Sequence, residues 1–319
     1  STLMRSSAAS DVYKRQDMYL TPDTMIEASR DCGYRTTVIG AVNNFTQSVE
    51  LLDEWYKKYH KKENLINFEL GFHAEYTTKK EILEGIADLA EKYKAPVYTH
   101  NSESESEVAQ CIERTKVTPT VYMDRLGIFN YGGGFYHCVH MTQNDLDIVK
   151  EHNISVITNP ASNLKLASGI APIDHMLKEG INLAIGTDGP ASNNCLDMFR
   201  EMFLVTALAK YRENDASAVD ALEVLKMATI GGAKAMNLTD CDVLAEGKEA
   251  DLIMIDLNQP NMQPIHNIQK NLVYSGSKQN VKLTMVAGKI LYENGEFFIG
   301  TDAYKIYEKA NDIAERIVK

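Results

Sequence analysis

The chain has 319 residues, of which 44% are hydrophobic, and its formal net charge at pH 7 is −11. Such an acidic chain is a poor partner for nucleic acids and anionic membranes, and no apolar run reaches the roughly 18 residues that a membrane-spanning helix needs. The five cysteines are scattered without a Cys-x-x-Cys pair, which indicates free thiols in a reducing, cytoplasmic compartment and excludes the Pro-Cys-x-x-Cys motif of cysteine-ligated zinc deaminases.

Strand and helix patterns alternate along most of the chain. Residues 1–16 show neither periodicity, and we expect them to be an unmatched leader. From Asp17 onward, seven strand–helix units predict a parallel sheet over residues 17–238, one strand short of a (β/α)8 barrel. The predicted strands after the first are Arg35–Val42, Leu65–Phe72, the strand ending at His100, Phe135–Val139, Ile154–Thr158 and Ile181–Ile185. Two long helices, roughly Leu196–Tyr211 and Ala218–Met236, close this part.

The pattern changes after Leu238. Short strands separated by turn residues replace the strand–helix alternation, and they predict a small antiparallel β-sandwich portion over residues 239–298. A C-terminal helix is expected within residues 299–319. The predicted strands here are Ala250–Leu257, Val281–Val286 and Lys289–Tyr292.

His100 and Glu103 lie where a buried strand gives way to a helix. His100 ends the apolar run from Ala95, and Glu103 follows in the turn before a helix that begins near Ser104. In parallel α/β folds the carboxyl ends of strands are where catalytic groups collect. A neutral imidazole there can bind a metal, and a neighbouring carboxylate can move protons. The alternative is a histidine that only bonds a helix cap.

Three further residues fall at the ends of predicted barrel strands: His73, His137 and Asp188. Each has a plain structural alternative, since His73 could be a loop histidine, either His137 or His140 could be a satisfied core histidine, and Asp188 could cap a helix. Imidazoles and carboxylates gathered on one rim of a barrel nevertheless favour a metal-dependent hydrolase.

Five runs of sequence carry a family resemblance. They are Thr-His-Asn-Ser-Glu (99–103), His-Cys-Val-His (137–140), Asn-Pro-Ala-Ser-Asn-Leu-Lys-Leu-Ala-Ser-Gly-Ile-Ala-Pro (159–172), Gly-Thr-Asp-Gly-Pro-Ala-Ser-Asn-Asn (186–194) and Glu-Gly-Lys-Glu-Ala-Asp-Leu (246–252). Together they resemble the amidohydrolase superfamily, and within it the branch of 5-methylthioadenosine/S-adenosylhomocysteine deaminases. The resemblance covers about residues 17–298 and implies a TIM-barrel hydrolase with a β-sandwich.

The resemblance also implies roles. His100 would bind a divalent metal, and Asp188 would bind it too and take a proton from the attacking water. Glu103 would pass protons to the substrate ring and contact the substrate. His137 would orient the water or the leaving group, and His73 would contact the substrate. The metal would be zinc, with iron or manganese as alternatives. The hydroxide would attack C6 of an adenosine-type nucleoside and release ammonia; a homo-oligomer is one expected assembly.

The chain departs from the family pattern in two places. The family places a His-x-His at the end of the first barrel strand, and none of the eight histidines here forms that pair, so strand one and two of four metal ligands are expected to be missing. The family also has arginines that grip a charged substrate tail, where this chain reads Asn43-Asn44-Phe45-Thr46-Gln47. Two alternatives stay open: another ring deaminase or chlorohydrolase, acting on guanine, cytosine or triazines, and an inactive barrel that only binds ligand.

Overall fold

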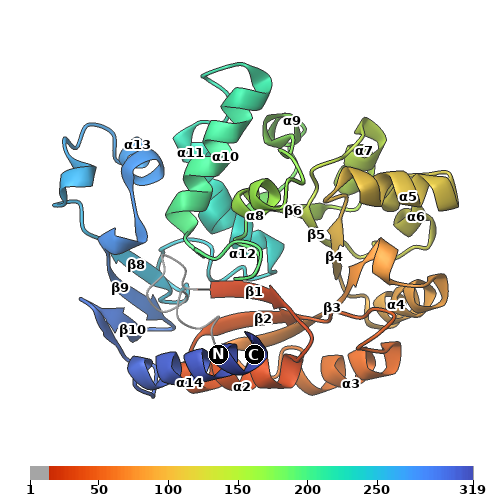
Figure 1. Cartoon of the computed structure of the whole chain (residues 1–319), viewed down its shortest axis with the longest axis horizontal. Helices are drawn as coiled ribbons and strands as arrows, with labels where there is room; N and C mark the ends of the chain where they lie inside the picture. The colour runs from red at the N-terminus through yellow and green to blue at the C-terminus, as the bar shows by residue number, and fades with distance from the viewer. Residues whose placement is uncertain (1–13, 319) are drawn as a thin grey trace.

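Seven parallel strands curl around a common axis at the centre of the molecule, with helices outside them (Figure 1). The computed structural model describes residues 14–318. The strand order in this sheet is β1-β2-β3-β4-β5-β6-β7, which confirms the predicted seven-stranded α/β barrel. The strands are β1 (Lys14–Met18), β2 (Arg35–Ile39), β3 (Ile66–Ala74), β4 (Val97–Asn101), β5 (Gly133–His137), β6 (Ile154–Thr158) and β7 (Leu183–Ile185).

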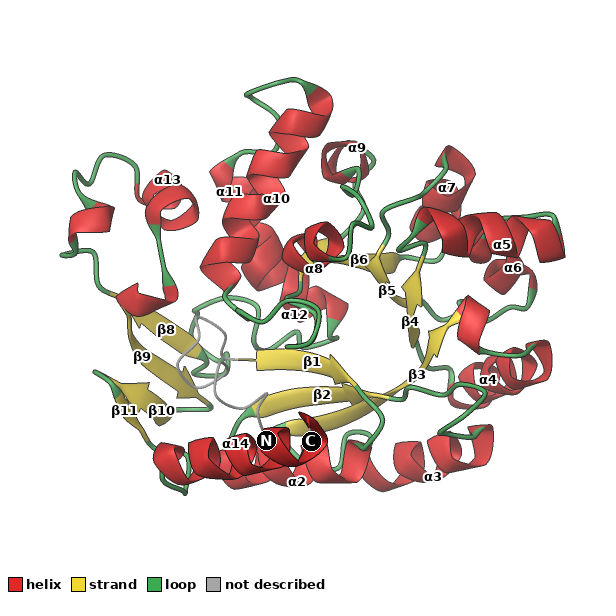
Figure 2. Cartoon of the chain, viewed as in Figure 1, coloured by secondary structure: helices red, strands yellow, loops and turns green. Residues whose placement is uncertain are grey.

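The helices connect consecutive strands and pack on the outside of the sheet (Figure 2). Several begin at the residues that sequence rules favour, as in α5, where Ser104 and Glu107 form a capping box. The helices up to β7 are α2 (Pro22–Cys32), α3 (Val49–Tyr59), α4 (Lys80–Tyr93), α5 (Glu105–Thr115), α6 (Pro119–Arg125), α7 (Gln143–Glu151), α8 (Pro160–Lys165) and α9 (Ile173–Lys178). After β7 come α10 (Met198–Glu213), α11 (Ala221–Lys226), α12 (Gly232–Ala235), α13 (Ile268–Lys270) and α14 (Ala303–Val318).

The predicted helix over 218–236 is broken in the structure. A π-helical turn, Met227–Gly231, separates α11 from α12. At Gly231 the chain touches the sheet so closely that a Cβ atom would lie 2.0 Å from the carbonyl oxygen of Leu183 in β7. The irregular turn therefore accompanies a backbone-to-backbone contact that only glycine allows, and periodicity alone could not reveal it.

The first strand begins at Lys14, so the last three residues of the expected leader belong to the sheet; residues 1–13 lie outside the described part of the chain. This stretch has no apolar alternation, and its first two side chains bond to polar partners far away in the sequence. The ammonium of Lys14 donates to the carbonyl of Cys241, and Arg15 donates to the hydroxyl of Ser29. Tertiary partners thus replace the apolar pattern by which a strand is normally recognised.

The small second sheet is antiparallel, with the order β11-β10-β9-β8. A buried ion pair joins it to the barrel. Arg35 in β2 donates to both carboxylate oxygens of Asp251, at 2.5 and 3.1 Å, and to Glu249 at 3.0 Å. Asp251 also accepts from the backbone N–H of Ala287. The strands of this small sheet are β8 (Leu252–Ile255), β9 (Val281–Val286), β10 (Lys289–Glu293) and β11 (Glu296–Phe297).

Because Arg35 is almost fully buried, the loss of its partner should lower the stability of the fold. We expect Asp251→Asn to lower the free energy of unfolding by about 2–3 kcal/mol, less than the 3–5 kcal/mol for outright loss of a buried partner, because the amide keeps one accepting oxygen. Urea denaturation followed by circular dichroism measures this. Glu249→Gln is the matched control, and it should cost less than about 1 kcal/mol because Glu249 is partly exposed. Equal losses in the two variants would contradict the assignment.

Strand β3 shows how the sheet divides apolar from polar side chains. Phe68, Leu70 and Phe72 are fully buried in the main hydrophobic core, whereas Glu69 and His73 alternate with them. Residues of one parity thus pack under the helices, and those of the other parity face the barrel interior. This alternation carries His73 to the rim of the barrel and leaves Glu69 buried below it.

Glu69 is a buried carboxyl with one oxygen that accepts from Asn67 at 2.8 Å and one that has no hydrogen-bond partner among the described residues. Its free oxygen lies 3.5 Å from Nδ1 of His60. Burial raises the pKa of Glu69 to about 7, and burial lowers the pKa of His60. Both shifts favour the neutral forms, so this contact is not an ion pair at neutral pH.

The raised pKa of Glu69 predicts a pH dependence of stability. The group binds its proton more tightly in the folded state, so its contribution is fully present below about pH 4.5 and is lost as the pH rises through about 7. Glu69→Gln should therefore raise the free energy of unfolding at pH 8 by about 1–3 kcal/mol and flatten its decline between pH 5 and pH 8. Urea midpoints across that range measure the effect, with exposed Glu54→Gln as control. Parallel pH profiles for the variant and the unaltered chain would show that Glu69 is ionised without penalty.

Candidate active site

The five side chains predicted for the site lie at one end of the barrel. His73 and His100 are the next-to-last residues of β3 and β4, and His137 is the last residue of β5. Glu103 lies two residues beyond β4, and Asp188 lies three residues beyond β7. The ring centroids of His73 and His100 are 5.0 Å apart, and those of His100 and His137 are 5.4 Å apart. Since parallel strands end at the same edge, the topology gathers residues that are far apart in sequence.

The hydrogen bonds of His73 and His100 define which ring nitrogen is free. Nδ1 of His100 lies 2.8 Å from the carbonyl oxygen of His73, which can only accept, so His100 donates through Nδ1. Nδ1 of His73 lies 2.9 Å from the hydroxyl of Thr77, whose hydrogen is directed to the carbonyl of Ala74. His73 must therefore donate through Nδ1 as well. Both rings keep an unprotonated Nε2 for a metal, a water or a substrate.

Both rings are neutral at pH 7. Burial, and next the interaction with His100 and His137, lowers the pKa of His73 to about 4. Burial and the neighbouring His137 lower the pKa of His100 to about 4. A neutral imidazole with a free Nε2 is the form that binds metal ions and accepts hydrogen bonds.

His137 is held in an unusual backbone conformation. Its φ is +72° and that of Cys138 is +50°, two successive left-handed residues that are not glycine. The N–H of Cys138 donates to the carbonyl of Asn101 at 3.1 Å, which ties the turn to the end of β4. Nδ1 of His137 donates to Asn163 at 2.7 Å, so its Nε2 is free and lies 3.7 Å from a carboxylate oxygen of Glu103. Burial lowers the pKa of His137, which is therefore neutral.

Glu103 is positioned by the start of α5. Its N–H donates to the carboxylate of Glu107 at 2.9 Å, within the capping box of that helix. Its own carboxyl receives a weak bond from Ser168, at 3.4 Å. Burial, and next the negative charge of Asp188, raises the pKa of Glu103. A carboxyl with a raised pKa beside a neutral imidazole suits general acid catalysis.

Asp188 is in the opposite electrostatic state. Its carboxylate accepts from the hydroxyls of Ser162 and Ser192, at 2.5 and 2.7 Å, and from the N–H of Gly189 at 2.6 Å. Burial acts to raise the pKa of Asp188, but these bonds outweigh it and leave the pKa below its ordinary value. Glu103 and Asp188 thus form a pair of carboxyl groups whose environments push their pKa values apart, the pattern that separates an acid from a base.

Sequence reasoning missed the residues that hold the predicted ones. Ser162 and Ser192 support Asp188, Asn163 supports His137, and Ser168 contacts Glu103. All four lie in the two runs, 159–172 and 186–194, that carry the family resemblance, and this was the only available signal. The sequence around a single serine or asparagine does not indicate a hydrogen-bond partner that lies so far along the chain.

His140 lies outside the cluster of site residues. Its Nε2 lies 2.7 Å from the carbonyl oxygen of Ser168, so the ring fastens the loop after α8 to the end of β5. Of the two histidines in the run 137–140, His137 is therefore the one that faces Glu103.

The donors available for a metal are right in kind but few in number. His100 offers a free Nε2 and Asp188 offers a carboxylate. Catalytic zinc takes three protein ligands and a water. Within residues 14–318, no group of three His, Cys, Asp or Glu side chains is placed to hold one metal ion. His100 and Asp188 alone do not make a catalytic zinc site.

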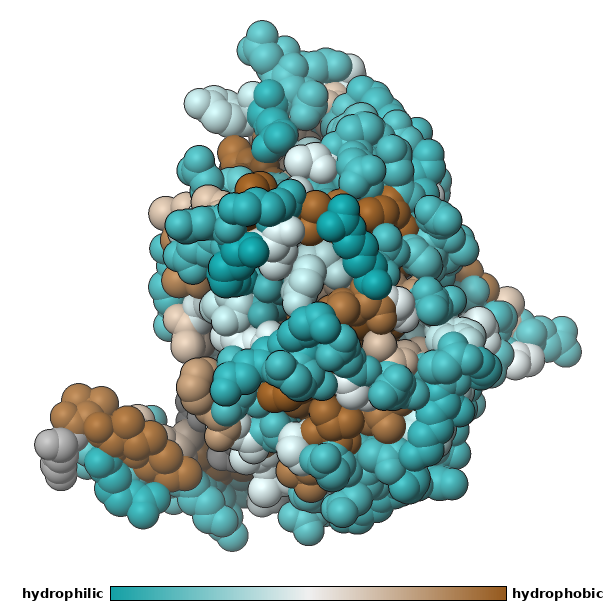
Figure 3. All heavy atoms as spheres, turned by 90° about the vertical axis from the view of Figure 1, so that its right-hand side faces the viewer, coloured by the Kyte–Doolittle hydropathy of each residue, from teal (hydrophilic) through white to brown (hydrophobic). Residues whose placement is uncertain are grey.

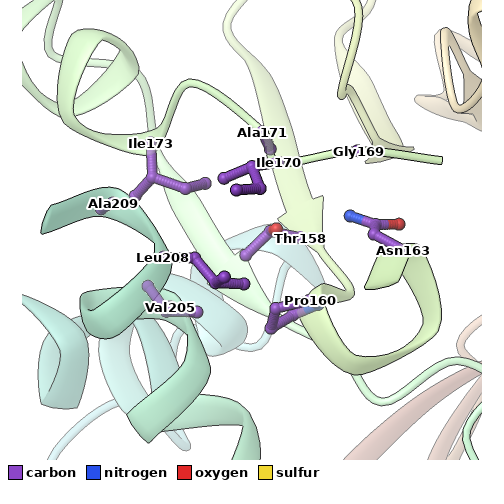
Figure 4. Close-up of a pocket in the computed structure, with 10 residues that line it drawn as sticks. All are labelled: Thr158, Pro160, Asn163, Gly169, Ile170, Ala171, Ile173, Val205, Leu208 and Ala209. Carbon is purple, nitrogen blue, oxygen red and sulfur yellow. The ribbon is translucent and has the colours of Figure 1, made fainter. Parts of the chain in front are cut away.

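A small pocket lies beside this cluster, between the loop after α8 and helix α10 (Figure 4). It encloses about 250 Å³ of empty space, part of it open to solvent. Its wall is mostly carbon, and of the polar groups that hold the site only Asn163 lines it. The pocket therefore lies behind Asn163 and is not the space between the histidines and Asp188. The residues that line it are Thr158, Pro160, Asn163, Gly169, Ile170, Ala171, Ile173, Val205, Leu208 and Ala209.

Comparisons with known proteins agree with this arrangement. A family model described as "Amidohydrolase family" matches residues 8–291. The chain is 36% identical to a 5-methylthioadenosine/S-adenosylhomocysteine deaminase of Thermoanaerobacter pseudethanolicus, over 94% of this chain and 72% of that protein. It is 34% identical to a 5'-deoxyadenosine deaminase of Methanopyrus kandleri, over 94% and 71%. A solved adenosine deaminase from Xanthomonas campestris with bound zinc superimposes with a TM-score of 0.92 at 31% identity, covering 97% of this chain and 72% of that one.

Proposed function

This chain belongs to the amidohydrolase family, and we propose that it is a hydrolytic deaminase which replaces the 6-amino group of an adenosine-type nucleoside by oxygen and releases ammonia. Among its relatives are proteins named 5-methylthioadenosine/S-adenosylhomocysteine deaminase and 5'-deoxyadenosine deaminase. The observation that carries the proposal is the pair Glu103 and Asp188, whose pKa values move in opposite directions in one cluster with three neutral imidazoles.

The reaction needs four proton movements. The attacking water must lose a proton, the ring nitrogen next to C6 must gain one, the hydroxyl group then formed on C6 must lose the second proton of the water, which restores the proton of the acid, and the amino group must gain one before it leaves as ammonia. We assign the second movement to Glu103, whose raised pKa keeps a proton available. Asp188, which is ionised, and His137, whose Nε2 is free, are the groups that take the proton of water and pass it to the amine.

We propose a divalent cation as cofactor, with zinc as the first candidate and iron or manganese as alternatives, and His100 and Asp188 as ligands from this chain. When bound, such a cation lowers the pKa of a coordinated water, which favours hydroxide near neutral pH. A third donor is lacking among residues 14–318, so the ligand count itself requires a test. Elemental analysis of the purified chain after incubation with zinc gives that count, and His100→Ala should reduce it.

His73 is assigned to substrate binding. Its Nδ1 is used by Thr77, so its Nε2 presents a lone pair and accepts a hydrogen bond from a ribose hydroxyl. We therefore propose that His73 contacts the substrate as a hydrogen-bond acceptor.

The test is ammonia release by the purified chain supplied with zinc. The substrates are adenosine, 5-methylthioadenosine, S-adenosylhomocysteine, guanine and cytosine. Turnover of an adenosine nucleoside supports the proposal, and turnover of guanine or cytosine alone would replace it by the ring-deaminase alternative. Binding without turnover would indicate a barrel that only binds ligand.

The substrate is a small molecule, and a homo-oligomer and a cytoplasmic location are further proposals from the sequence. All five cysteines are free, in agreement with a reducing compartment. None of the helices within residues 14–318 combines the length and the apolar character that crossing a membrane requires.

A further inference from the structure

Helix α10 carries a carboxylate that none of the roles above uses. Glu201 is fully buried, and its two oxygens accept from two different segments: one from the N–H of Ala161 in helix α8 at 3.0 Å, the other from the side-chain amide of Asn193 in the loop after β7 at 2.8 Å. Burial raises the pKa of Glu201 to about 7, and the bonds from Ala161 and Asn193 oppose that rise. A buried carboxyl needs hydrogen-bond partners, and both oxygens of Glu201 have one.

The first of these segments, helix α8, supports His137. Ala161 lies in the first turn of α8, directly before Ser162, which donates to Asp188, and Asn163, which accepts from His137. Helix α8 has only six residues and packs beside α10, as Figure 4 shows for Pro160 and Asn163 across from α10 residues. Its position therefore depends on the contact with Glu201.

The second segment, the loop after β7, carries Asp188. The amide of Asn193 donates both to Glu201 and, at 2.6 Å, to the carbonyl of Thr187, the residue before Asp188. Both amide hydrogens are thus used, and Asn193 cannot turn its amide without losing one bond. The φ of Asp188 is +58°, a left-handed conformation that the loop must hold in place.

We infer that Glu201 is a positioning residue that clamps helix α8, which bears Asn163, and the loop that bears Asp188 to helix α10, and so fixes His137 and Asp188 relative to each other. The catalytic consequence rests on the proposed function, whereas the structural consequence does not. Removing Glu201 should free α8 and weaken the bond that keeps the proton on Nδ1 of His137.

Nitrogen-15 NMR of the histidine rings at pH 8 tests the clamp without any need for turnover. In the unaltered chain His137 should show a single tautomer, with the proton on Nδ1. In Glu201→Ala the ring-nitrogen signals of His137 should move to chemical shifts averaged over the two tautomers. Glu213→Ala, an exposed position at the end of the same helix, is the control and should leave the signal unchanged. A His137→Gln variant assigns the resonance.

Activity supplies the second readout. Glu201→Gln should lower kcat by about 10- to 100-fold, the usual effect of losing a group that orients catalytic residues, with KM changed less than about threefold. An unchanged His137 tautomer in folded Glu201→Ala, or full kcat in Glu201→Gln, would overturn the inference.

If Glu201→Ala does not fold, Asn193→Ala takes its place. It releases only the loop of Asp188, and should lower kcat while leaving the His137 tautomer intact; full kcat there would also overturn the clamp. Absence of turnover in the unaltered chain would defeat the proposed function and not the clamp, because the ring signals report on the clamp alone.

Discussion

Glu103→Gln should lower the rate of ammonia release by about 10²-fold or more, the usual loss when a general acid is removed. The glutamine is isosteric and cannot give a proton to the substrate ring. Little else should change, because the backbone N–H of Glu103 stays bonded to Glu107 and the capping box of α5 does not involve the Glu103 side chain. The melting temperature should therefore not fall.

The pH profile is the second readout for Glu103. Burial raises the pKa of Glu103, so the proton it must donate is present at acidic pH and is lost as the pH rises through that pKa. The alkaline limb of kcat against pH should come from this group and disappear in Glu103→Gln. Exposed Glu105→Gln, two residues further on, is the control. A Glu103→Gln variant that keeps its rate, or that loses bound zinc instead, would show that the carboxylate is a ligand and not the acid.

The position of this residue could be predicted because it depends on strand period and strand ends. His100 closes an apolar run, and a helix start follows at once, so the sequence alone places Glu103 at the carboxyl rim of a parallel sheet. His73 could be placed by the same reasoning. Seven strands in consecutive order then bring these ends together without further information.

The parts that could not be predicted depend on tertiary contact. The bond from Ser162 to Asp188 joins residues that are 26 positions apart, and nothing in either sequence run encodes that pairing. The left-handed backbone of His137 is fixed by bonds to the end of β4. The residue is not a glycine, which is the sequence signal for such a conformation. The start of β1 could not be predicted for the same reason, since Lys14 and Arg15 are polar and bond to distant partners.

The loop after β2 bears on which substrate tail the site can bind. The stretch Asn43–Gln47 lacks arginine, so weak hydrogen bonds from the side-chain amides of Asn43 and Gln47 are what it could offer a substrate tail. The structure shows that these amides are already used. Asn43 donates to the carbonyl of Ala41 and the hydroxyl of Thr46, and Gln47 donates to the carbonyls of Tyr19 and Leu20.

The large side chains exposed at this rim of the barrel are apolar instead. Phe45 is 82% exposed, and three more large side chains at the ends of β1 and β3 are also exposed. Figure 3 views the molecule from the side towards which β1 points in Figure 1, and it shows hydrophobic patches between hydrophilic ones. Such a rim matches an uncharged tail better than a zwitterionic one. The other three side chains are Tyr19, Leu20 and Tyr76.

We therefore expect kcat/KM to be at least about 10²-fold higher for adenosine or 5-methylthioadenosine than for S-adenosylhomocysteine. A carboxylate tail needs charge-assisted hydrogen bonds, each contributing about 1.5–3 kcal/mol, and the turn that would carry the arginines supplies none. Ammonia release over a range of concentrations of the three nucleosides gives the ratio. His73→Ala should raise KM for all three by a similar factor, since the ribose hydroxyls are common to them. A preference for S-adenosylhomocysteine would mean that another cation reaches the tail, and Lys165, whose ammonium bonds the carbonyl of Ala191 beside the Asp188 loop, would be the first residue to replace.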